Sequence, residues 1–593
     1  YETVDDPLST AAIAQLKGLG LMVNTQRNMT ISYGNTTALG AMLQVNRKLS
    51  SNGRNVTLRT DANYSNSDSK TFSTQDIQYF QLQDALGNDS TYRAYRYNLM
   101  PTKSWDYALQ ATYSEPIARK TYLQFSYQFK YGFSKSDRDT YDLSALPSGT
   151  FGSLKPAYRS WDNYLGLLTN PLGNYLDNNL SRNSEYRTYT HDMQVMMRMI
   201  RDKWKMNVGV MFQPQHSTYM QDYLGVHVDT ARTVFNWSPT FDFRYKFSEQ
   251  SNLRINYRGT IAQPTMSQLL SIVDNTDPQN ISIGNPGLKP AFTNNFRLFY
   301  NTYKQSHAQA LMTFANFSTT RNDIGNSVTY DAVTGARTIQ PVNVNGNWGA
   351  DAGLMYNMSI DSAGVWNIHT FSRANFNRYV SYLQLNRTSS LDKNITKSLN
   401  LAERLAASYR TSWLELELDG SVDYTNTKNN LQSMSNLRTW QFAYGGTLSL
   451  NLPWNMSIST DLHQNSRRGY SDASLNTNEL LWNAQISQSM LKGNALTFSL
   501  QFYDILRQQS NLSRVINSVS RTDTEYNSIN SYIMLRATYR LNLFGGKNAM
   551  PKPKDGPGFD RNGPGMGPGG GQRPPRGERP SGPPPSGGGF GGF

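Results

Sequence analysis

The sequence contains no cysteine, so it offers neither a disulfide framework nor a cysteine-based metal site or nucleophile. Charged residues make up only 17% of its 593 residues, and no stretch approaches the ~20 apolar residues that a membrane helix needs. A helical membrane protein is therefore excluded. A transmembrane barrel is not, because each of its strands turns half of its side chains to a polar interior.

The net charge is +14, a value that raises the hypothesis of nucleic-acid binding. The positive residues are spread thinly along the chain, however, and no cluster or nucleic-acid motif accompanies them. We therefore expect no nucleic-acid partner.

Apolar and polar residues alternate over many long segments. Leu414, Leu416 and Leu418 alternate with Glu415, Glu417 and Asp419, and similar patterns run through residues 123–134, 204–212, 496–502 and 535–543. Successive side chains of a strand point to opposite faces, so these are strands with one apolar and one polar face. So many two-faced strands are hazardous unless the sheet closes.

The predicted connections fall into two kinds that alternate along the chain. The short ones are residues 50–53, 116–119, 201–203, 248–250, 361–364, 411–412, 453–455 and 492–494. The long polar ones include residues 139–184, 215–230 and 263–290. This asymmetry is typical of bacterial outer-membrane barrels, with tight periplasmic turns and long external loops.

Tryptophan recurs beside the short connections, at Trp204, Trp366, Trp413 and Trp454. Indole rings favour the membrane–water interface. We expect these residues to form a periplasmic aromatic girdle; ordinary core packing is the alternative.

The predicted fold is an all-β, transmembrane, antiparallel up-and-down barrel. The pattern gives about nineteen strands, whereas plugged transporters of this type have about 22, so we expect the first strands to lie outside this chain. The expected organisation is a loop remnant at 1–27, the barrel at 28–544, and a disordered Gly/Pro-rich periplasmic tail at 545–593.

Four short segments resemble the TonB-dependent-receptor-like outer-membrane β-barrel family of Bacteroidota. They are Asn52-Gly53-Arg54-Asn55-Val56-Thr57-Leu58 with the strand after it, Tyr113-Ser114-Glu115-Pro116-Ile117, Gly284-Asn285-Pro286-Gly287-Leu288-Lys289-Pro290, and the closing segment 539–546. The resemblance covers residues 28–546 and implies import through a barrel, a plug domain and a TonB box. No plug or TonB box is visible in this sequence, so the resemblance implies that a separate N-terminal piece would link the barrel to the TonB complex. We expect Gly284–Pro290 to be structural, with Gly287 permitting positive φ.

The inner-face charges are candidates for contact with a solute or a plug. Glu415, Glu417, Asp419 and Asp423 form an acidic stripe, which predicts either a cation site or ordinary pairing with neighbouring basic residues. Arg536 and Arg540 are candidates for contact with a plug or an anionic solute, or belong to a solvated lumen.

The segment 139–184 carries the candidate external ligand contacts, Tyr158, Trp161, Tyr164 and Tyr175. The same segment is rich in leucine, so it either grips a ligand or packs into its own cap over the pore.

The six histidines are scattered, and no nucleophile motif accompanies them. We therefore expect no enzyme activity, no catalytic or metal-binding residues and no cofactor.

The leading hypothesis is the barrel portion of an outer-membrane importer of a bulky solute or peptide. The alternatives are a non-transporting outer-membrane scaffold or assembly-partner barrel, and a soluble all-β binding protein. Expected partners are outer-membrane lipid, the plug piece and, through it, the TonB complex, with a lipoprotein as a further candidate.

Overall fold

A computed structural model describes residues 23–540, except residues 148–149, 151–164, 385–389, 432–435, 471–475, 492–493, 511, 517–520 and 526–529. The predicted C-terminal tail lies outside the described residues. No helix within the described part of the chain has the length and apolarity to cross a membrane.

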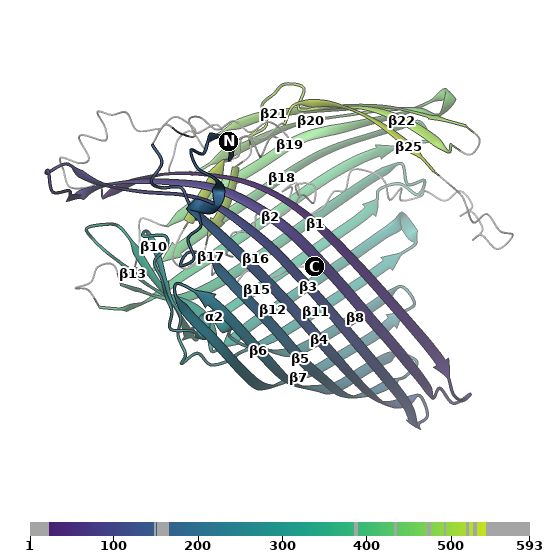
Figure 1. The fold of residues 1–593 in the computed structure, drawn as a ribbon. Coiled ribbons are helices and arrows are strands. Elements are labelled where there is room, and N and C mark those ends of the chain that lie inside the picture. Colours follow the sequence, from purple (N-terminus) through teal and green to yellow (C-terminus); the bar gives the residue numbers. More distant parts are fainter. Residues whose placement is uncertain are drawn as a thin grey trace.

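Most of the described residues belong to one curved sheet of 23 strands (Figure 1). Nineteen of these strands form a continuous wall, in which neighbours along the wall pair antiparallel. They are β1 (Asn24–Lys48), β2 (Asn55–Gln83), β3 (Asp89–Ala118), β4 (Thr121–Asp142), β5 (Arg182–Ile200), β6 (Trp204–Tyr223), β7 (Val226–Ser248), β8 (Ser251–Ala262), β11 (Ala291–Lys304), β12 (Gln309–Arg321), β15 (Asn347–Ser359), β16 (Trp366–Gln384), β17 (Asp392–Arg410), β18 (Leu414–Asn429), β19 (Leu437–Leu452), β20 (Met456–Arg468), β21 (Asn478–Met490), β22 (Leu496–Tyr503) and β25 (Tyr532–Tyr539).

The remaining four strands of the sheet are short and lie at one end of the wall. They are β9 (Val273–Asp274), β10 (Asn280–Ile283), β13 (Asp323–Tyr330) and β14 (Arg337–Val344). A separate hairpin pairs β23 (Leu512–Ile516) with β24 (Arg521–Glu525). The short helices are η2 (Leu172–Tyr175), α2 (Met266–Leu269), η3 (Ser306–Ala308) and η5 (Pro453–Asn455). The prediction of an all-β antiparallel barrel with about nineteen wall strands is confirmed.

The wall has an apolar outer face and a polar inner face. On β18 the side chain of Leu418 is 60% exposed on the outer face, whereas the neighbouring Asp419 side chain points inward and is 6% exposed. The direct cross-strand partners of Leu418 are Ala407 on β17 and Gly446 on β19, so at this level the outer face is free of polar side chains on the neighbouring strands too. The period-two pattern of the sequence therefore sets which side chains enter the lumen.

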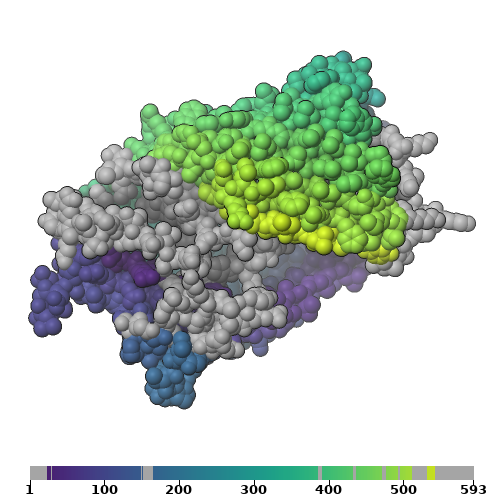
Figure 2. Space-filling view, turned by 90° about the horizontal axis from the view of Figure 1, so that it is seen from above, coloured from purple at the N-terminus to yellow at the C-terminus, as the bar shows by residue number. Residues whose placement is uncertain are grey.

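The described sheet has two edge strands. Among the described residues β1 pairs only with β2, and β25 pairs only with β22. In Figure 2 the purple strands at the start of the described residues and the yellow strands at their end face each other.

The interpretation of residues 215–230 as a long loop is wrong. The strands β6 and β7 run through this segment and are joined by Leu224 and Gly225 alone, both with positive φ (53° and 72°). Two-residue turns with positive φ match the twist of paired antiparallel strands. This hairpin continues the wall far beyond its apolar belt, so its outer face no longer needs apolar residues and the alternation disappears.

Most predicted short turns are found where expected, and they gather at one end of the wall, which we call the short-turn end. The turn predicted at 116–119 lies slightly later, at Arg119 and Lys120, because β3 continues to Ala118. The connection through η3 is a further short turn that the sequence pattern did not predict. The opposite end, with the connections between β4 and β5 and between β8 and β11, is called the long-loop end.

Candidate functional site: the inner face and its cap

The inner face is lined by ion pairs whose acids lie against the wall. Lys130 Nζ is 2.6 Å from Asp192 Oδ2, with side chains 44% and 8% exposed, respectively. Arg373 Nε is 2.7 Å from Asp351 Oδ1, and Arg244 and Arg254 share Asp242, with the acid again the less exposed partner. The cationic ends therefore project farther into the lumen than the carboxylates that neutralise them.

The predicted acidic stripe on β18 points inward, and three of its four carboxylates have basic partners. Glu415 pairs with Arg410, and Glu417 lies 3.4 Å from His369 Nε2. Asp419 is 2.7 Å from His463 Nε2 and 3.6 Å from Arg404 Nη2. No basic partner of Asp423 was found among the described residues. Three of the four carboxylates therefore face basic groups, and no group of three potential metal ligands occurs in the described ranges.

A cap crosses the inside of the long-loop end. It is built from residues 263–290, which contain α2, β9 and β10, and from the β13–β14 hairpin. The strand β10 pairs in parallel with β14, β14 pairs with β13, and β13 pairs in parallel with the end of β16. The cap thus leaves the wall at β8 and is anchored again at β16.

Its other side is held against β1, β2, β3 and β6 by long-range hydrogen bonds. Gln279 Nε2 donates to Tyr79 Oη at 3.1 Å, and Arg96 Nη2 donates to the carbonyl of Thr276 at 2.8 Å. Gln75 Nε2 donates to Asp277 at 3.1 Å, and Tyr223 Oη donates to Asp274 at 2.9 Å. Tyr79 and Tyr223 are buried beneath the cap. The cap therefore spans the mouth between strands that lie far apart in the sheet.

Gly284–Pro290 forms the exit of the cap into β11, which begins at Ala291. Asn285 Nδ2 donates to the carbonyl of Pro341 at 3.0 Å, and Asn285 N donates to the carbonyl of Gln268 at 2.6 Å. Gly287 does not adopt positive φ. The glycine that the packing requires is Gly284, where a Cβ atom would lie 1.8 Å from the carbonyl oxygen of Leu270.

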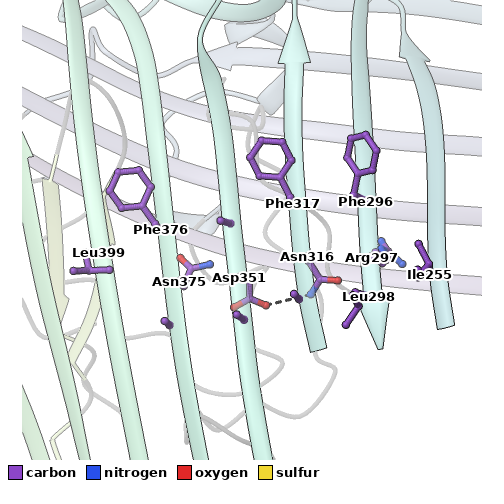
Figure 3. Close-up of a pocket in the computed structure, with 14 residues that line it drawn as sticks. Ile255, Phe296, Arg297, Leu298, Asn316, Phe317, Asp351, Asn375, Phe376 and Leu399 are labelled. Carbon is purple, nitrogen blue, oxygen red and sulfur yellow. Dashed lines mark hydrogen bonds between the residues drawn. The ribbon is translucent and has the colours of Figure 1, made fainter. Parts of the chain in front are cut away.

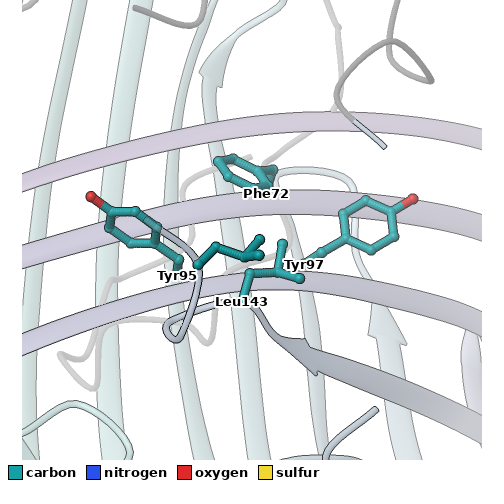
Figure 4. Close-up of a cluster of buried hydrophobic side chains, with 5 residues drawn as sticks. Phe72, Tyr95, Tyr97 and Leu143 are labelled. Atoms are coloured by element: carbon teal, nitrogen blue, oxygen red, sulfur yellow. The ribbon is translucent and has the colours of Figure 1, made fainter. Parts of the chain in front are cut away.

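The connection between β4 and β5 packs on the outer face of β2 and β3, above the apolar belt. Phe72, Tyr95, Tyr97 and Leu143 form a buried cluster there (Figure 4). Tyr175 and the leucines at 165, 168 and 172 pack against this cluster, and Tyr175 Oη lies 3.0 Å from Thr169 Oγ1. The other aromatic candidates, Tyr158, Trp161 and Tyr164, lie outside the described residues.

A hollow of about 500 Å³ lies on the outer face of β11, β12, β15 and β16. Figure 3 shows Phe296 and Phe317 on the neighbouring strands β11 and β12 and Phe376 on β16, which is separated from β12 by β15. Ala315, Ala350, Ala352 and Ala374 line its floor. Because these side chains face away from the lumen, the hollow is part of the outer surface and not of the passage.

The four tryptophans of the predicted girdle all lie at the short-turn end. Trp204 and Trp366 begin β6 and β16, Trp413 directly precedes β18, and Trp454 lies in η5. The last three are exposed, and the Trp366 ring packs against Tyr409 with centroids 4.8 Å apart. This common level is the arrangement expected of a girdle.

Arg536 lies on β25 opposite Ser499, and Arg540 directly follows that strand. Both are exposed at the edge of the described sheet, away from the cap.

At the long-loop end, His227 Nδ1 lies 2.5 Å from Asp222 Oδ1 across the β6–β7 hairpin. This contact raises the pKa of His227. The sequence gives no sign of this pair, because Asp222 and His227 become neighbours only through the register of β6 with β7.

The sequence pattern also missed the cap residues Gln279, Asp274 and Thr276 and their wall partners. No local signal marks them, because they are ordinary polar residues that meet only when segments about 50 to 200 positions apart are brought together.

Among solved structures, the chain is similar to the copper transporter OprC (12% identity, TM-score 0.37, covering 81% of this chain and 75% of that one). It is also similar to the ferric citrate transporter FecA (12%, 0.41, 82% and 62%). A third is the ferric-catecholate import receptor Fiu from K12 E. coli (12%, 0.43, 86% and 64%). The chain therefore spans less than two thirds of FecA and of Fiu, and at these values the likeness carries no functional argument. No curated protein matches the sequence.

The family comparison is more specific. Residues 47–392 match the family described as "Outer membrane protein beta-barrel family". This segment is more than half of the chain and runs from the end of β1 to the start of β17. The chain therefore belongs to the outer membrane protein beta-barrel family, a family of the bacterial outer membrane.

Proposed function

We propose that this barrel is the wall of an importer that carries a bulky polar solute or peptide across the outer membrane. The observation that supports it best is the inner face, where polar residues and ion pairs line the whole wall from β2 to β21. The interior of small barrels is filled by packed side chains, whereas barrels as large as this one enclose cavities or channels.

The cap gives the passage its selectivity. It is anchored on both sides of the mouth, by β16 and by β1, β2 and β3. In this proposal a solute enters beside the cap, and the cap limits the size and shape of what passes.

In the proposed orientation the long-loop end faces the exterior and the short-turn end faces the periplasm. The difference in connection length supports this orientation, because outer-membrane barrels have short periplasmic turns and longer external loops. A plug domain, which this chain would receive from a further segment or partner, would close the lumen and connect it to TonB; a lipoprotein is a second candidate partner.

The test is solute entry into vesicles that contain the full chain. We expect polar peptides and oligosaccharides to enter, and we expect Gln279→Ala to accelerate entry, since it removes the hydrogen bonds that join the cap to Tyr79 on β2 and to Asn24 on β1. Gln44→Ala, on the edge strand and remote from the cap, is the matched control.

If neither the natural chain nor Gln279→Ala admits any solute, the protein is a scaffold and the proposal fails. For a solute that does enter, uptake by cells with and without functional TonB then tests whether import depends on energy from TonB.

A further inference from the structure

Two arginines meet on the inner face just below the long-loop end. Arg138 on β4 is the direct cross-strand partner of Arg182 on β5. Asn183 pairs with Asp222, which brings Tyr223 of β6 beside Arg182. The guanidinium carbons of both arginines lie 5.4 Å from the centroid of the Tyr223 ring. Like charges placed opposite each other destabilise a sheet, and a shared aromatic face offsets only part of that cost.

The same wall contains a second cross-strand arginine pair, in which a carboxylate lies between the two positive charges. Arg244 and Arg254 are also direct cross-strand partners. Asp242 lies between them, with its oxygens 3.1 Å from Arg244 Nε and 2.6 Å from Arg254 Nε. At this pair the chain therefore supplies its own carboxylate.

No described carboxylate lies within 4.0 Å of Arg138 or Arg182. The nearby Asp274 of the cap instead accepts hydrogen bonds from Tyr223 Oη and, at 2.7 Å, from Thr276 Oγ1. The arginine pair at the mouth therefore lacks the neutralising acid that its counterpart has.

The two guanidinium groups also keep unused donors. Arg138 Nη2 donates to the carbonyl of Leu180 at 3.0 Å, and its buried Nε has no acceptor among the described residues. Arg182 Nη2 makes one long contact of 3.4 Å to Tyr219 Oη. A guanidinium carries five N–H donors in a planar fork that fits a carboxylate or a phosphate.

We propose that Arg138 and Arg182, which both stack on the buried ring of Tyr223, form a binding site for an oxyanion group, a carboxylate or a phosphate, on a solute that enters the mouth. This assigns a substrate class to the proposed function and rests on it. The site faces the lumen, so lipid headgroups around the outer face do not reach it. The cationic ends that project from the wall below continue the favourable potential along the passage.

The test is equilibrium binding to the full chain in detergent micelles, by calorimetry at constant ionic strength. Citrate and inorganic phosphate are the two probes, and their separate titrations distinguish a carboxylate site from a phosphate site. We expect at least one probe to bind, and Arg138→Gln with Arg182→Gln to weaken that binding at least tenfold. Heat-modifiable gel migration confirms that each variant is folded.

Arg244→Gln with Arg254→Gln is the matched control, because it removes the same charge from the same cross-strand geometry. We expect it to change the affinity less than twofold. Arg138→Lys with Arg182→Lys keeps the charge but loses the planar forks, and we expect intermediate binding.

Equal weakening by both glutamine pairs would show that only the total charge of the lumen matters, and would overturn the site. If neither citrate nor phosphate binds to the natural chain, the proposed site is overturned as well. Binding is measured without transport, so arginine-dependent binding in a barrel that admits no solute would leave the site standing while the import function fails.

Discussion

Placing an arginine on the outer face of β18 tests whether lipid covers that face. Leu418 points outward, and its side chain is 60% exposed. It lies four residues above the start of β18, beside the short turn that holds Trp413. With a rise of about 3.3 Å per residue and a strand tilt of about 45°, this places Leu418 roughly 10 Å above the tryptophan level, near the middle of an apolar band about 25 Å tall.

The expected cost of Leu418→Arg follows from this depth. A charged side chain at the midplane of a barrel costs about 2–4 kcal/mol. Loss of the leucine surface adds roughly 1–2 kcal/mol, because the 60% that faces outward is surface that hydrocarbon covers. We therefore expect a loss of about 3–6 kcal/mol in the free energy of unfolding.

The matched variant is Thr447→Arg, at the same depth on the inner face. Thr447 on β19 lies directly opposite Glu417 on β18 and Asp461 on β20. One oxygen of Glu417 is buried without a described hydrogen-bond donor, so an arginine here gains a partner. We expect a change within about 1 kcal/mol.

The assay is urea unfolding of the full chain in phospholipid vesicles, followed by intrinsic fluorescence and by heat-modifiable migration. If the two arginine variants differ by less than about 1 kcal/mol, the outer face is not in hydrocarbon and the depth argument fails.

Two further predictions concern the long-loop end. Gly284→Ala should destabilise the cap by about 1–3 kcal/mol, because the new Cβ collides with the backbone of Leu270. Limited proteolysis within residues 263–290 measures the effect, with Gly287→Ala as the control. Equal cleavage of the two variants would contradict the prediction. His227 should titrate above its ordinary pKa of 6.5, because the Asp222 carboxylate favours its charged form. Its contribution to stability is then complete below pH 6.5 and lost as the pH rises through the raised pKa; in an NMR titration Asp222→Asn should bring the pKa back, and an unchanged pKa would contradict the assignment.

The wall could be predicted from the sequence because its information is local. Alternation along one strand specifies both faces, as at Leu416, Glu417 and Leu418, and the length of a connection marks the end of the barrel at which it lies. Alternation does not reveal the hairpin turn at Leu224 and Gly225, because the parts of β6 and β7 beyond the apolar belt are largely polar on both faces and lose the alternating pattern.

The cap and the arginine site could not be predicted in the same way. The contact of Gln279 with Tyr79 joins residues 200 positions apart. Arg138 and Arg182 become neighbours only once the register of β4 with β5 is known. The missing carboxylate at Arg138 and Arg182 stands out only by comparison with Asp242 at the Arg244–Arg254 pair. That comparison also requires the register of β7 with β8.

The hydrogen bonds of Asn24 have a consequence for the order of assembly. Asn24, the first residue of β1, binds Gln279 and the carbonyl of Thr334, which follow it by 255 and 310 positions. Contacts between such distant residues form slowly, because the closure entropy of the intervening chain must be lost first. The start of β1 pairs with β2 at Tyr79, but its contacts with the cap form only after the middle of the polypeptide has been inserted. The mouth is therefore completed among the last steps of biogenesis.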